Sequence, residues 1–187
     1  GQGVPRYVSR SDTEAEKRGV WLFSLLFVLT ISSIVALLIV IVLFSRVERI
    51  IDSAQAFMLL LFFAASIPFF AGMRTGVGAI RGFENTIYRT YTKHIAYPTG
   101  RILLLITFVF LEFGVLSAGY AYFVSSVAAF ILSHIYLSKL MALSGSFNSN
   151  YREILSFSLP LVVSTFTFRL LTEIDTLMIG YFLSSTQ

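Results

Sequence analysis

Three ionisable side chains stand close together in an otherwise apolar stretch near the end of the chain. Arg169, Glu173 and Asp175 lie within the segment from Tyr151 to Phe182. One charged side chain at the centre of a bilayer costs about 2.5–3.5 kcal/mol on insertion scales, so three would not persist facing lipid. Arg169 and Glu173 are four residues apart and can pair on one helix face. We predict that the three line a polar cavity that meets a charged substrate or a coupling ion. An ion pair that locks two helices, or a position near the outer surface, is the alternative.

A basic connector follows the second apolar stretch of the chain. It contains Arg74, Arg81, Arg89 and Lys93, interleaved with tyrosines. Such a segment can attract phosphate-bearing lipid head groups. The alternative is the ordinary excess of Lys and Arg in cytoplasmic loops, together with contacts to anionic lipid. The glycines of this connector do not form a phosphate-binding loop, because no strand precedes them and no Gly-Lys-Ser/Thr follows.

Two prolines lie inside apolar stretches. Pro68 and Pro160 each follow a serine by two positions. A proline removes one backbone hydrogen bond of a helix and kinks it, and kinked helices are hinge candidates in transporters. Accommodation by packing explains them equally well.

The composition places these residues in a membrane protein. Of the 187 residues, 56% are hydrophobic and 13% are charged, whereas about a quarter of the residues of a soluble domain are charged. There is no Cys, and the two His are far apart in the sequence, so we expect no disulfide, metal site or cofactor. The net charge of +4 is distributed between apolar runs, which argues against nucleic acid as a partner.

The apolar runs predict an all-α integral membrane protein, a polytopic helical bundle. Four transmembrane helices are expected at about 20–44, 54–73, 92–111 and 118–137. The stretch 102–137 is too long for one crossing, so a turn is expected at 112–119, the region with its one charge and two glycines. In this scheme Arg101 snorkels towards the interface, and His134 is a packed histidine near the end of its helix. Residues 1–19 form a cytoplasmic loop, 141–150 a linker, and 151–187 a fifth helical segment.

The distribution of Lys and Arg gives the orientation. With five spans, eleven basic residues fall on one side and only Arg46 and Arg49 on the other. The first segment is therefore expected in the cytoplasm. Because the chain starts at Gly1 in a polar segment and stops at Gln187 just after an apolar stretch, we expect it to be a fragment of a longer polytopic protein.

Several motifs resemble those of a known family. Residues 155–161 (LSFSLPL) and 173–183 (EIDTLMIGYFL) resemble the opening helix of the second lobe in polysaccharide flippases. These are the O-antigen (Wzx-type) and related oligosaccharide-lipid transporters of the multidrug/oligosaccharidyl-lipid/polysaccharide superfamily. Residues 3–10 (GVPRYVSR) are similar to the cytoplasmic loop between the second and third helices of that family. Residues 80–83 (IRGF) are similar to the segment after its fourth helix.

The resemblance implies the third to seventh helices of a two-lobe transporter with a central, partly cationic cavity. Residues 20–140 would belong to the first lobe and residues 151–187 to the second. Arg169, Glu173 and Asp175 would line the cavity. The family's usual arginine stands roughly where Glu173 stands here, so the resemblance leaves open which residue meets the pyrophosphate of the substrate.

The expected function is a flippase that moves lipid-linked oligosaccharide or polysaccharide repeat units across the cell membrane of a prokaryote by alternating access. Its partners would be that substrate, membrane lipids and a coupling cation, H+ or Na+, and it would not be an enzyme. A cation-coupled multidrug exporter is one alternative, but the first two spans contain none of the acidic residues it would need. A polymerase or ligase of polysaccharide assembly is another, and it would need a large outer loop, whereas the outer loops here are short.

Overall fold

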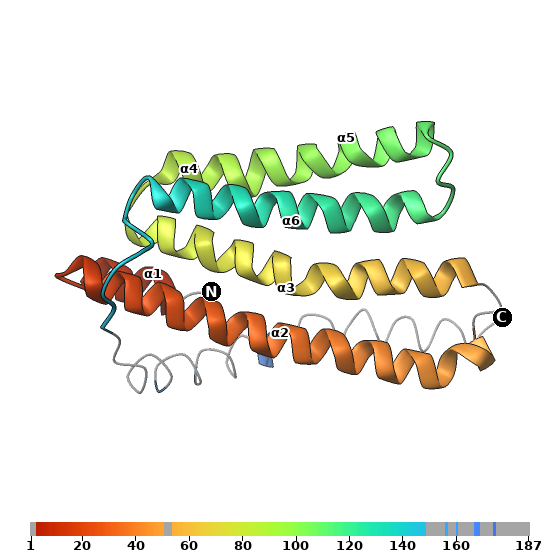
Figure 1. Cartoon of the computed structure of the whole chain (residues 1–187), viewed down its shortest axis with the longest axis horizontal. Coiled ribbons are helices and arrows are strands. Elements are labelled where there is room, and N and C mark those ends of the chain that lie inside the picture. Colours follow the sequence, from red (N-terminus) through yellow and green to blue (C-terminus); the bar gives the residue numbers. More distant parts are fainter. Residues whose placement is uncertain are drawn as a thin grey trace.

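The structure, a computed structural model, describes residues 3–50 and 54–148 and five single positions beyond them, namely 156, 160, 167, 168 and 174. Helices follow one another along the chain, and residues 3–50 and 54–148 contain no strand. The elements are α1 (Gly3–Arg10), α2 (Glu14–Ile50), α3 (Ala54–Gly82), α4 (Thr86–Thr90), the π-helical segment η1 (Tyr91–Ala96), α5 (Tyr97–Phe110) and α6 (Leu116–Ser138). The long helices lie side by side as a bundle (Figure 1). The expected all-α fold is confirmed.

The bundle has the surface of a membrane protein. Among the described residues, three helical stretches are long and apolar enough to cross a bilayer, at Glu14–Val42, Gln55–Gly82 and Leu116–Ser138. A further helical run continues from Thr86 to Phe110 through α4, η1 and α5. Large apolar side chains of α2 are exposed along its length, among them Leu26, Ile34, Leu37, Leu38, Ile41 and Val42. Exposure of an apolar surface of this extent to water is unfavourable, whereas its contact with lipid is favourable. The chain is a multi-pass membrane protein.

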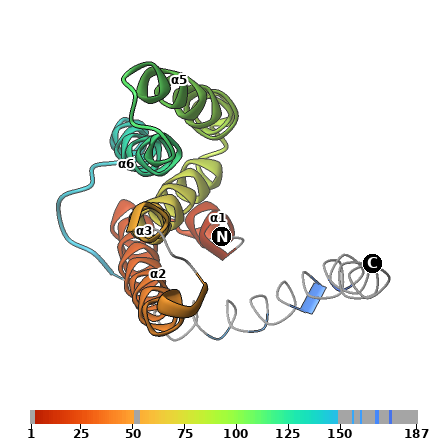
Figure 2. The same cartoon turned by 90° about the vertical axis from the view of Figure 1, so that its right-hand side faces the viewer.

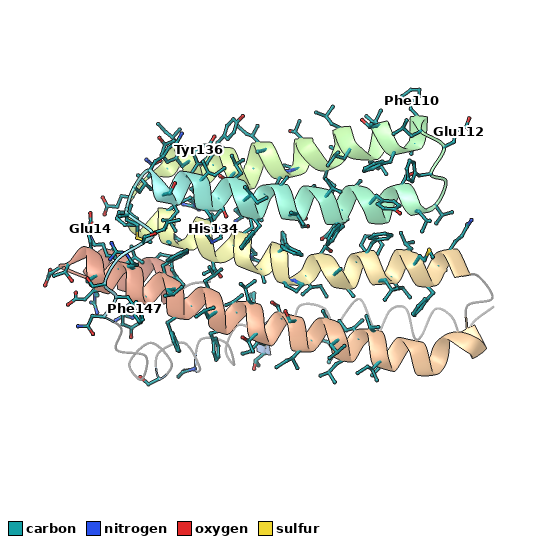
Figure 3. All side chains as sticks on the ribbon, viewed as in Figure 1. Glu14, Phe110, Glu112, His134, Tyr136 and Phe147 are labelled. Carbon is teal, nitrogen blue, oxygen red and sulfur yellow. The ribbon has the colours of Figure 1, made fainter. Side chains whose placement is uncertain are left out.

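The helices extend beyond the apolar runs that predicted them. α2 begins at Glu14, and α3 continues past Met73 to Gly82. Arg74 and Arg81 therefore lie on a helix and not in a connector, since charged residues continue a helix readily where it leaves the hydrocarbon. The turn between α5 and α6 spans residues 111–115, and Glu112 lies at the end of the bundle opposite Glu14 (Figure 3). Positive φ angles of 60° at Glu112 and 58° at Gly114 make this reversal tight.

Small residues bring α3 and α6 together. A Cβ atom at Gly72 would lie 2.6 Å from Cε2 of Phe130, and one at Gly76 would lie 2.7 Å from Oγ of Ser133. Along α6, Ser125 and Ala129 continue the buried row that contains Ser133. Small residues at a four-residue spacing allow close backbone approach, which is how transmembrane helices pack in lipid. In Figure 2, α2, α3, α6 and α5 follow one another across the bundle, and α6 contacts both α3 and α5.

α3 carries Pro68 in its interior. Pro68 has no N–H to donate to the carbonyl of Ala64, one turn earlier. Nearby, the hydroxyl of Ser66 donates to the carbonyl oxygen of Phe63 at 2.6 Å. α3 changes direction about halfway along its length (Figure 1).

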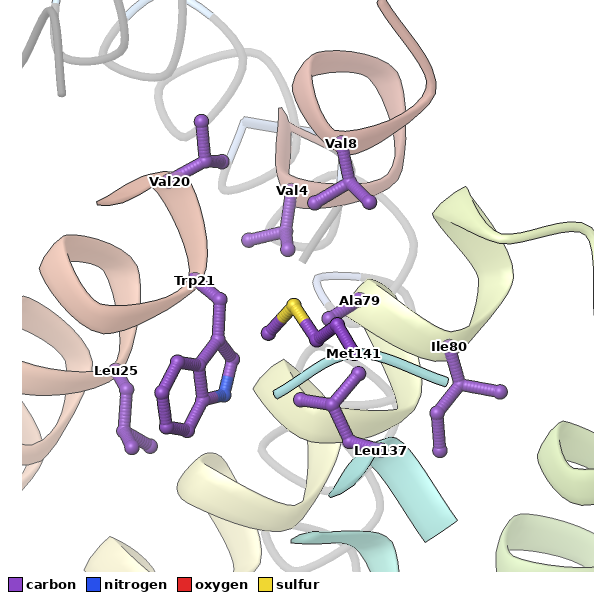
Figure 4. Packing of buried hydrophobic residues seen from close by; sticks show 9 residues of the cluster. All are labelled: Val4, Val8, Val20, Trp21, Leu25, Ala79, Ile80, Leu137 and Met141. Carbon is purple, nitrogen blue, oxygen red and sulfur yellow. The ribbon is translucent and has the colours of Figure 1, made fainter. Parts of the chain in front are cut away.

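One end of the bundle is closed by α1, and we call it the basic end. α1 packs against α2 and α3, and a Cβ at Gly82 would lie 2.6 Å from Cβ of Val8. A buried cluster here joins α1, α2, α3 and the end of α6 around Trp21 (Figure 4). The basic residues of this end are Arg6, Arg10, Lys17, Arg18, Arg81, Arg89, Lys93 and Lys139.

Candidate functional site

The structure describes only some of the site residues that the sequence predicts. Arg169, Glu173 and Asp175 lie outside the described residues, so their cavity role stays a prediction. Pro160 is helical and exposed, but its neighbours also lie outside the described part.

The four predicted head-group residues separate into two places. Arg81 is exposed near the end of α3, Arg89 is half-buried on α4, and Lys93 is exposed in η1. All three belong to the basic end. Arg74 lies eight residues before the end of α3 at Gly82, about 12 Å further into the bundle at 1.5 Å per residue.

Aromatic stacking holds α4 against α6 beside these residues. The rings of Tyr88 and Tyr136 are parallel within 4° with centroids 4.6 Å apart. Lys139 Nζ lies 5.4 Å from the centroid of the Tyr136 ring. Lys139, Arg89 and Lys93 are thus held at one end of the bundle, which favours contact with anionic lipid head groups.

Arg74 belongs to a second arrangement, which we call the arginine–aromatic strip: Phe70 and Arg74 of α3, Tyr97 and Arg101 of α5, and Tyr122 of α6. Arg74 Cζ lies 5.8 Å from the centroid of the Phe70 ring, and the rings of Phe70 and Tyr97 are 5.4 Å apart. Arg101 Cζ lies 5.7 Å from the ring of Tyr97 and 5.3 Å from that of Tyr122. The five side chains therefore form a continuous line of contacts across three helices.

Arg101 of the strip lies in the interior of a long helical run. Arg101 is nine residues before the end of α5 at Phe110, about 14 Å at 1.5 Å per residue. In the other direction the helical run continues back from Arg101 to Thr86. Arg101 is therefore about 22 Å from Thr86 and about 14 Å from Phe110 at 1.5 Å per residue, far from either end of the run. The expectation that Arg101 snorkels towards the interface stays a prediction.

Neither arginine of the strip has a carboxylate partner in the described part of the chain. The ion pair that the described residues form is between Arg18 and Glu14, at 3.8 Å. Aromatic faces stabilise Arg74 and Arg101 by cation–π attraction instead, which leaves the guanidinium N–H donors available. Arg101 lies in the interior of its helical run, and an arginine held inside a membrane is costly, which is typical of a functional site.

The chemistry of the strip suits an anionic sugar-bearing ligand. A guanidinium binds phosphate oxygens through two parallel hydrogen bonds, and its planar fork also stacks on aromatic rings. The aromatic rings offer flat apolar faces and, in Tyr97 and Tyr122, hydroxyl groups. Tyr97 Oη is buried and forms no hydrogen bond of standard geometry within the described residues. The strip therefore offers two phosphate-binding guanidinium groups beside aromatic rings.

Sequence reasoning missed Arg101 as a site residue, but a signal was present. Both arginines of the strip have an aromatic residue four positions earlier, Phe70 before Arg74 and Tyr97 before Arg101. A spacing of four places two side chains on the same face of a helix. This pattern indicates an arginine that lies against an aromatic ring of its own helix.

Long apolar helices that bury small residues against one another define a polytopic helical membrane protein. The family model described as "Polysaccharide biosynthesis protein" matches residues 1–187, and the chain belongs to this family. Searches of curated proteins and of solved structures give no match. Family membership gives the protein a role in polysaccharide biosynthesis, carried out in the membrane.

Proposed function

We propose that the protein is a flippase that translocates lipid-linked oligosaccharide or polysaccharide repeat units across the cell membrane of a prokaryote by alternating access. The observation that carries this proposal is the arginine–aromatic strip, in which Arg74 and Arg101 lie against aromatic rings and have no carboxylate partner in the described structure. Membership of a polysaccharide biosynthesis family supports it, since sugar units built on a lipid carrier must cross the membrane before they are assembled outside.

The strip offers two phosphate-binding points at different depths. Arg74 lies nearer the basic end and Arg101 deeper along the same line of contacts. A diphosphate that links a sugar to its lipid carries charges that a guanidinium binds strongly in a low dielectric. Passage from Arg74 to Arg101 would keep these charges compensated while the sugar moves along the rings of Phe70, Tyr97 and Tyr122.

The remaining predicted residues take places around this path. The basic end would face the cytoplasm, with Arg81, Arg89 and Lys93 on anionic lipid head groups. Pro68 and Pro160 would act as hinges. Arg169, Glu173 and Asp175 would line the opposite wall of the cavity, on the first helix of the second lobe.

Two other functions fit less well. A multidrug exporter of organic cations would place acidic residues in the membrane, whereas the strip presents two arginines that repel cations. A membrane enzyme such as a polymerase or ligase would need a cluster of catalytic groups. In the described part of the chain no three His, Cys, Asp or Glu side chains gather at one place. The two arginines of the strip favour transport of an anionic substrate.

The test is a flipping assay in proteoliposomes that contain a fluorescent undecaprenyl-diphosphate-linked sugar. Arg101→Gln removes the charge, and a hydrogen-bonded ionic contact contributes about 1.5–3 kcal/mol, so the rate is expected to fall about 10–100-fold. Arg10→Gln at the exposed end of α1 is the matched control and is expected to leave the rate unchanged. Equal rates for wild type and Arg101→Gln would overturn the proposal.

A further inference from the structure

His134 of α6 is enclosed by three helices close to the basic end. Its ring centroid lies 4.3 Å from that of Phe130, one turn earlier, and 5.8 Å from that of Trp21 on α2. On the α3 side, a Cβ at Gly76 would lie 3.3 Å from Cε1 of His134. The imidazole therefore fills the joint at which α2, α3 and α6 meet.

The hydrogen bonds of His134 determine which nitrogen carries the proton. Nδ1 lies 2.8 Å from the carbonyl oxygen of Phe130. A carbonyl oxygen only accepts, so Nδ1 must be the donor. The hydroxyl of Ser133 donates to the same carbonyl at 2.7 Å. In the neutral ring Nε2 is then an acceptor with a free lone pair.

Two buried polar atoms remain without partners at this joint. Nε2 of His134 and Nε1 of Trp21 are both buried, and neither has a hydrogen-bond partner within the described residues. The indole N–H of Trp21 can only donate, whereas Nε2 of neutral His134 can only accept. Figure 4 shows the indole nitrogen on the side of Leu137, which follows His134 on α6. Trp21 thus brings an unpartnered donor to this joint, and neutral His134 brings an unpartnered acceptor.

We infer that Nε2 of His134 is a proton-binding atom, and that its protonation separates His134 from Trp21 and loosens the closure of the basic end. The proton comes from water at that end and adds to the Nε2 lone pair. The ring then has two N–H donors and a positive charge, so the joint contains two buried N–H donors without partners, one from each ring. The proton site itself does not depend on the proposed function. Its use as the coupling site of a transporter rests on that function, and the coupling ion would then be H+.

The charged side chains on the helices that pack around His134 do not neutralise the positive charge that protonation would add. Arg18 on α2 is bound to carbonyl groups that follow α6. Arg74 of α3 and Lys139 after α6 each lie over an aromatic ring on α3 and α6 respectively. α1 contributes Tyr7 at the edge of the cluster that contains Trp21. These groups are cations or a phenol, so an imidazolium at His134 meets no carboxylate among the contacts of the described residues.

Protonation at this place acts on the whole closure. Trp21 is 6% exposed and belongs to the buried cluster that joins Val4 and Val8 of α1 to Leu137 and Met141. A charge introduced beside Trp21 is costly unless water reaches it or the helices separate. Histidine protonation that changes an interface in this way is an established type of switch.

The experiment uses the fluorescence of Trp21, which is the one tryptophan of the chain. The full chain is placed in lipid nanodiscs and titrated between about pH 8 and pH 5, the range in which histidine changes charge. An imidazolium next to an indole quenches its emission, so wild-type emission is expected to fall towards acid pH. His134→Gln is expected to lose this pH dependence entirely. His94→Gln, at the exposed histidine of η1, is the matched control and should titrate as wild type does.

A second measurement requires no variant. The ¹⁵N shifts of the wild-type imidazoles report directly whether His134 gains a proton in this range, and acrylamide quenching reports whether Trp21 becomes accessible at acid pH. Emission that is independent of pH, or that titrates equally in His134→Gln, overturns the proton site. A titrating His134 with no gain in acrylamide access overturns the loosening. If the wild-type protein shows the expected fluorescence titration but does not flip the labelled lipid-linked sugar, the proposed function is contradicted and the proton site is not.

Discussion

Nε of Arg18, near the start of α2, donates a hydrogen bond of 2.7 Å to the carbonyl oxygen of Ala142, which lies beyond the end of α6. The same guanidinium donates to the carbonyl oxygen of Ser146, and the backbone N–H of Asn148 donates to the carbonyl oxygen of Ala15 at 3.1 Å. The segment after α6, which the sequence predicts to lead into a second lobe, is therefore fastened to the first turns of α2. A single buried arginine makes two of the bonds that hold it.

Replacement of Arg18 is expected to release this segment. Hydrogen bonds to charged groups contribute about 1.5–3 kcal/mol each, and Arg18 is only 6% exposed. Arg18→Ala should lower the melting temperature and speed proteolytic cleavage between residues 142 and 148, measured by mass spectrometry of the fragments. Arg18→Lys should restore only part of the protection, because one ammonium lacks the planar fork that reaches two carbonyls. Equal cleavage of Arg18→Ala and of the exposed-site variant Arg10→Ala would contradict the fastening role.

The close approach of α3 and α6 predicts a difference between two glycines. Gly72→Ala places a Cβ 2.6 Å from Cε2 of Phe130, whereas a Cβ at Gly100 of α5 meets nothing within 4 Å. Overpacking a tight contact costs about 1–3 kcal/mol, and an open helical site gains up to about 1 kcal/mol from alanine. Gly72→Ala should therefore melt at a lower temperature than wild type, and Gly100→Ala at the same or a higher one. The reverse order in a thermal unfolding assay in detergent would refute the packing.

The sequence predicted where the membrane helices lie in the chain better than it predicted where each helix ends, and the reason is physical. The uncharged run from Val20 to Phe44 predicted a membrane helix, and the structure has α2 there. Hydropathy reports how deep a residue lies in lipid, however, and not where its helix ends. The charged flanks of α2 and the end of α3 after Met73 are therefore helical although they are not apolar.

The site was harder to predict, because its partners come from different helices. Arg101 was expected to snorkel towards the interface, because the length of the stretch 102–137 required its span to begin before it. Its contact with Tyr97 on the same helix could be read from their spacing, but Tyr122 lies on α6 and is brought to it only by the fold. His134 was expected to be a packed histidine, and the sequence could not reveal that its ring lies beside Trp21 with Nε2 buried and without a hydrogen-bond partner in the described residues. The cavity role of Arg169, Glu173 and Asp175 remains a prediction.

The turn before α4 predicts that removal of one side-chain amide, that of Asn85, lowers the stability of the protein. The Oδ1 atom of Asn85 caps α4 by accepting a hydrogen bond of 2.9 Å from the backbone N–H of Tyr88. Loss of such a cap costs about 1 kcal/mol, and an aspartate keeps it. Asn85→Ala should lower the melting temperature, while Asn85→Asp should leave it near the wild-type value. Because α4 presents Tyr88 to Tyr136, hydrogen exchange in residues 86–96 should also be faster in Asn85→Ala, and unchanged exchange there would contradict the role of the cap.

The second ring beside Arg101 predicts how the arginine–aromatic strip depends on aromatic faces. Arg101 Cζ lies 5.3 Å from the ring of Tyr122, and a desolvated cation–π contact contributes up to about 2 kcal/mol. Tyr122→Phe keeps the ring and is expected to flip the labelled lipid-linked sugar at close to the wild-type rate. Tyr122→Leu keeps the apolar volume but removes the ring, so flipping should slow several-fold, by less than Arg101→Gln slows it because the ring of Tyr97 remains. If Tyr122→Leu and Tyr122→Phe flip equally fast, the ring does not hold the guanidinium for substrate, and Arg101 must be positioned by another group.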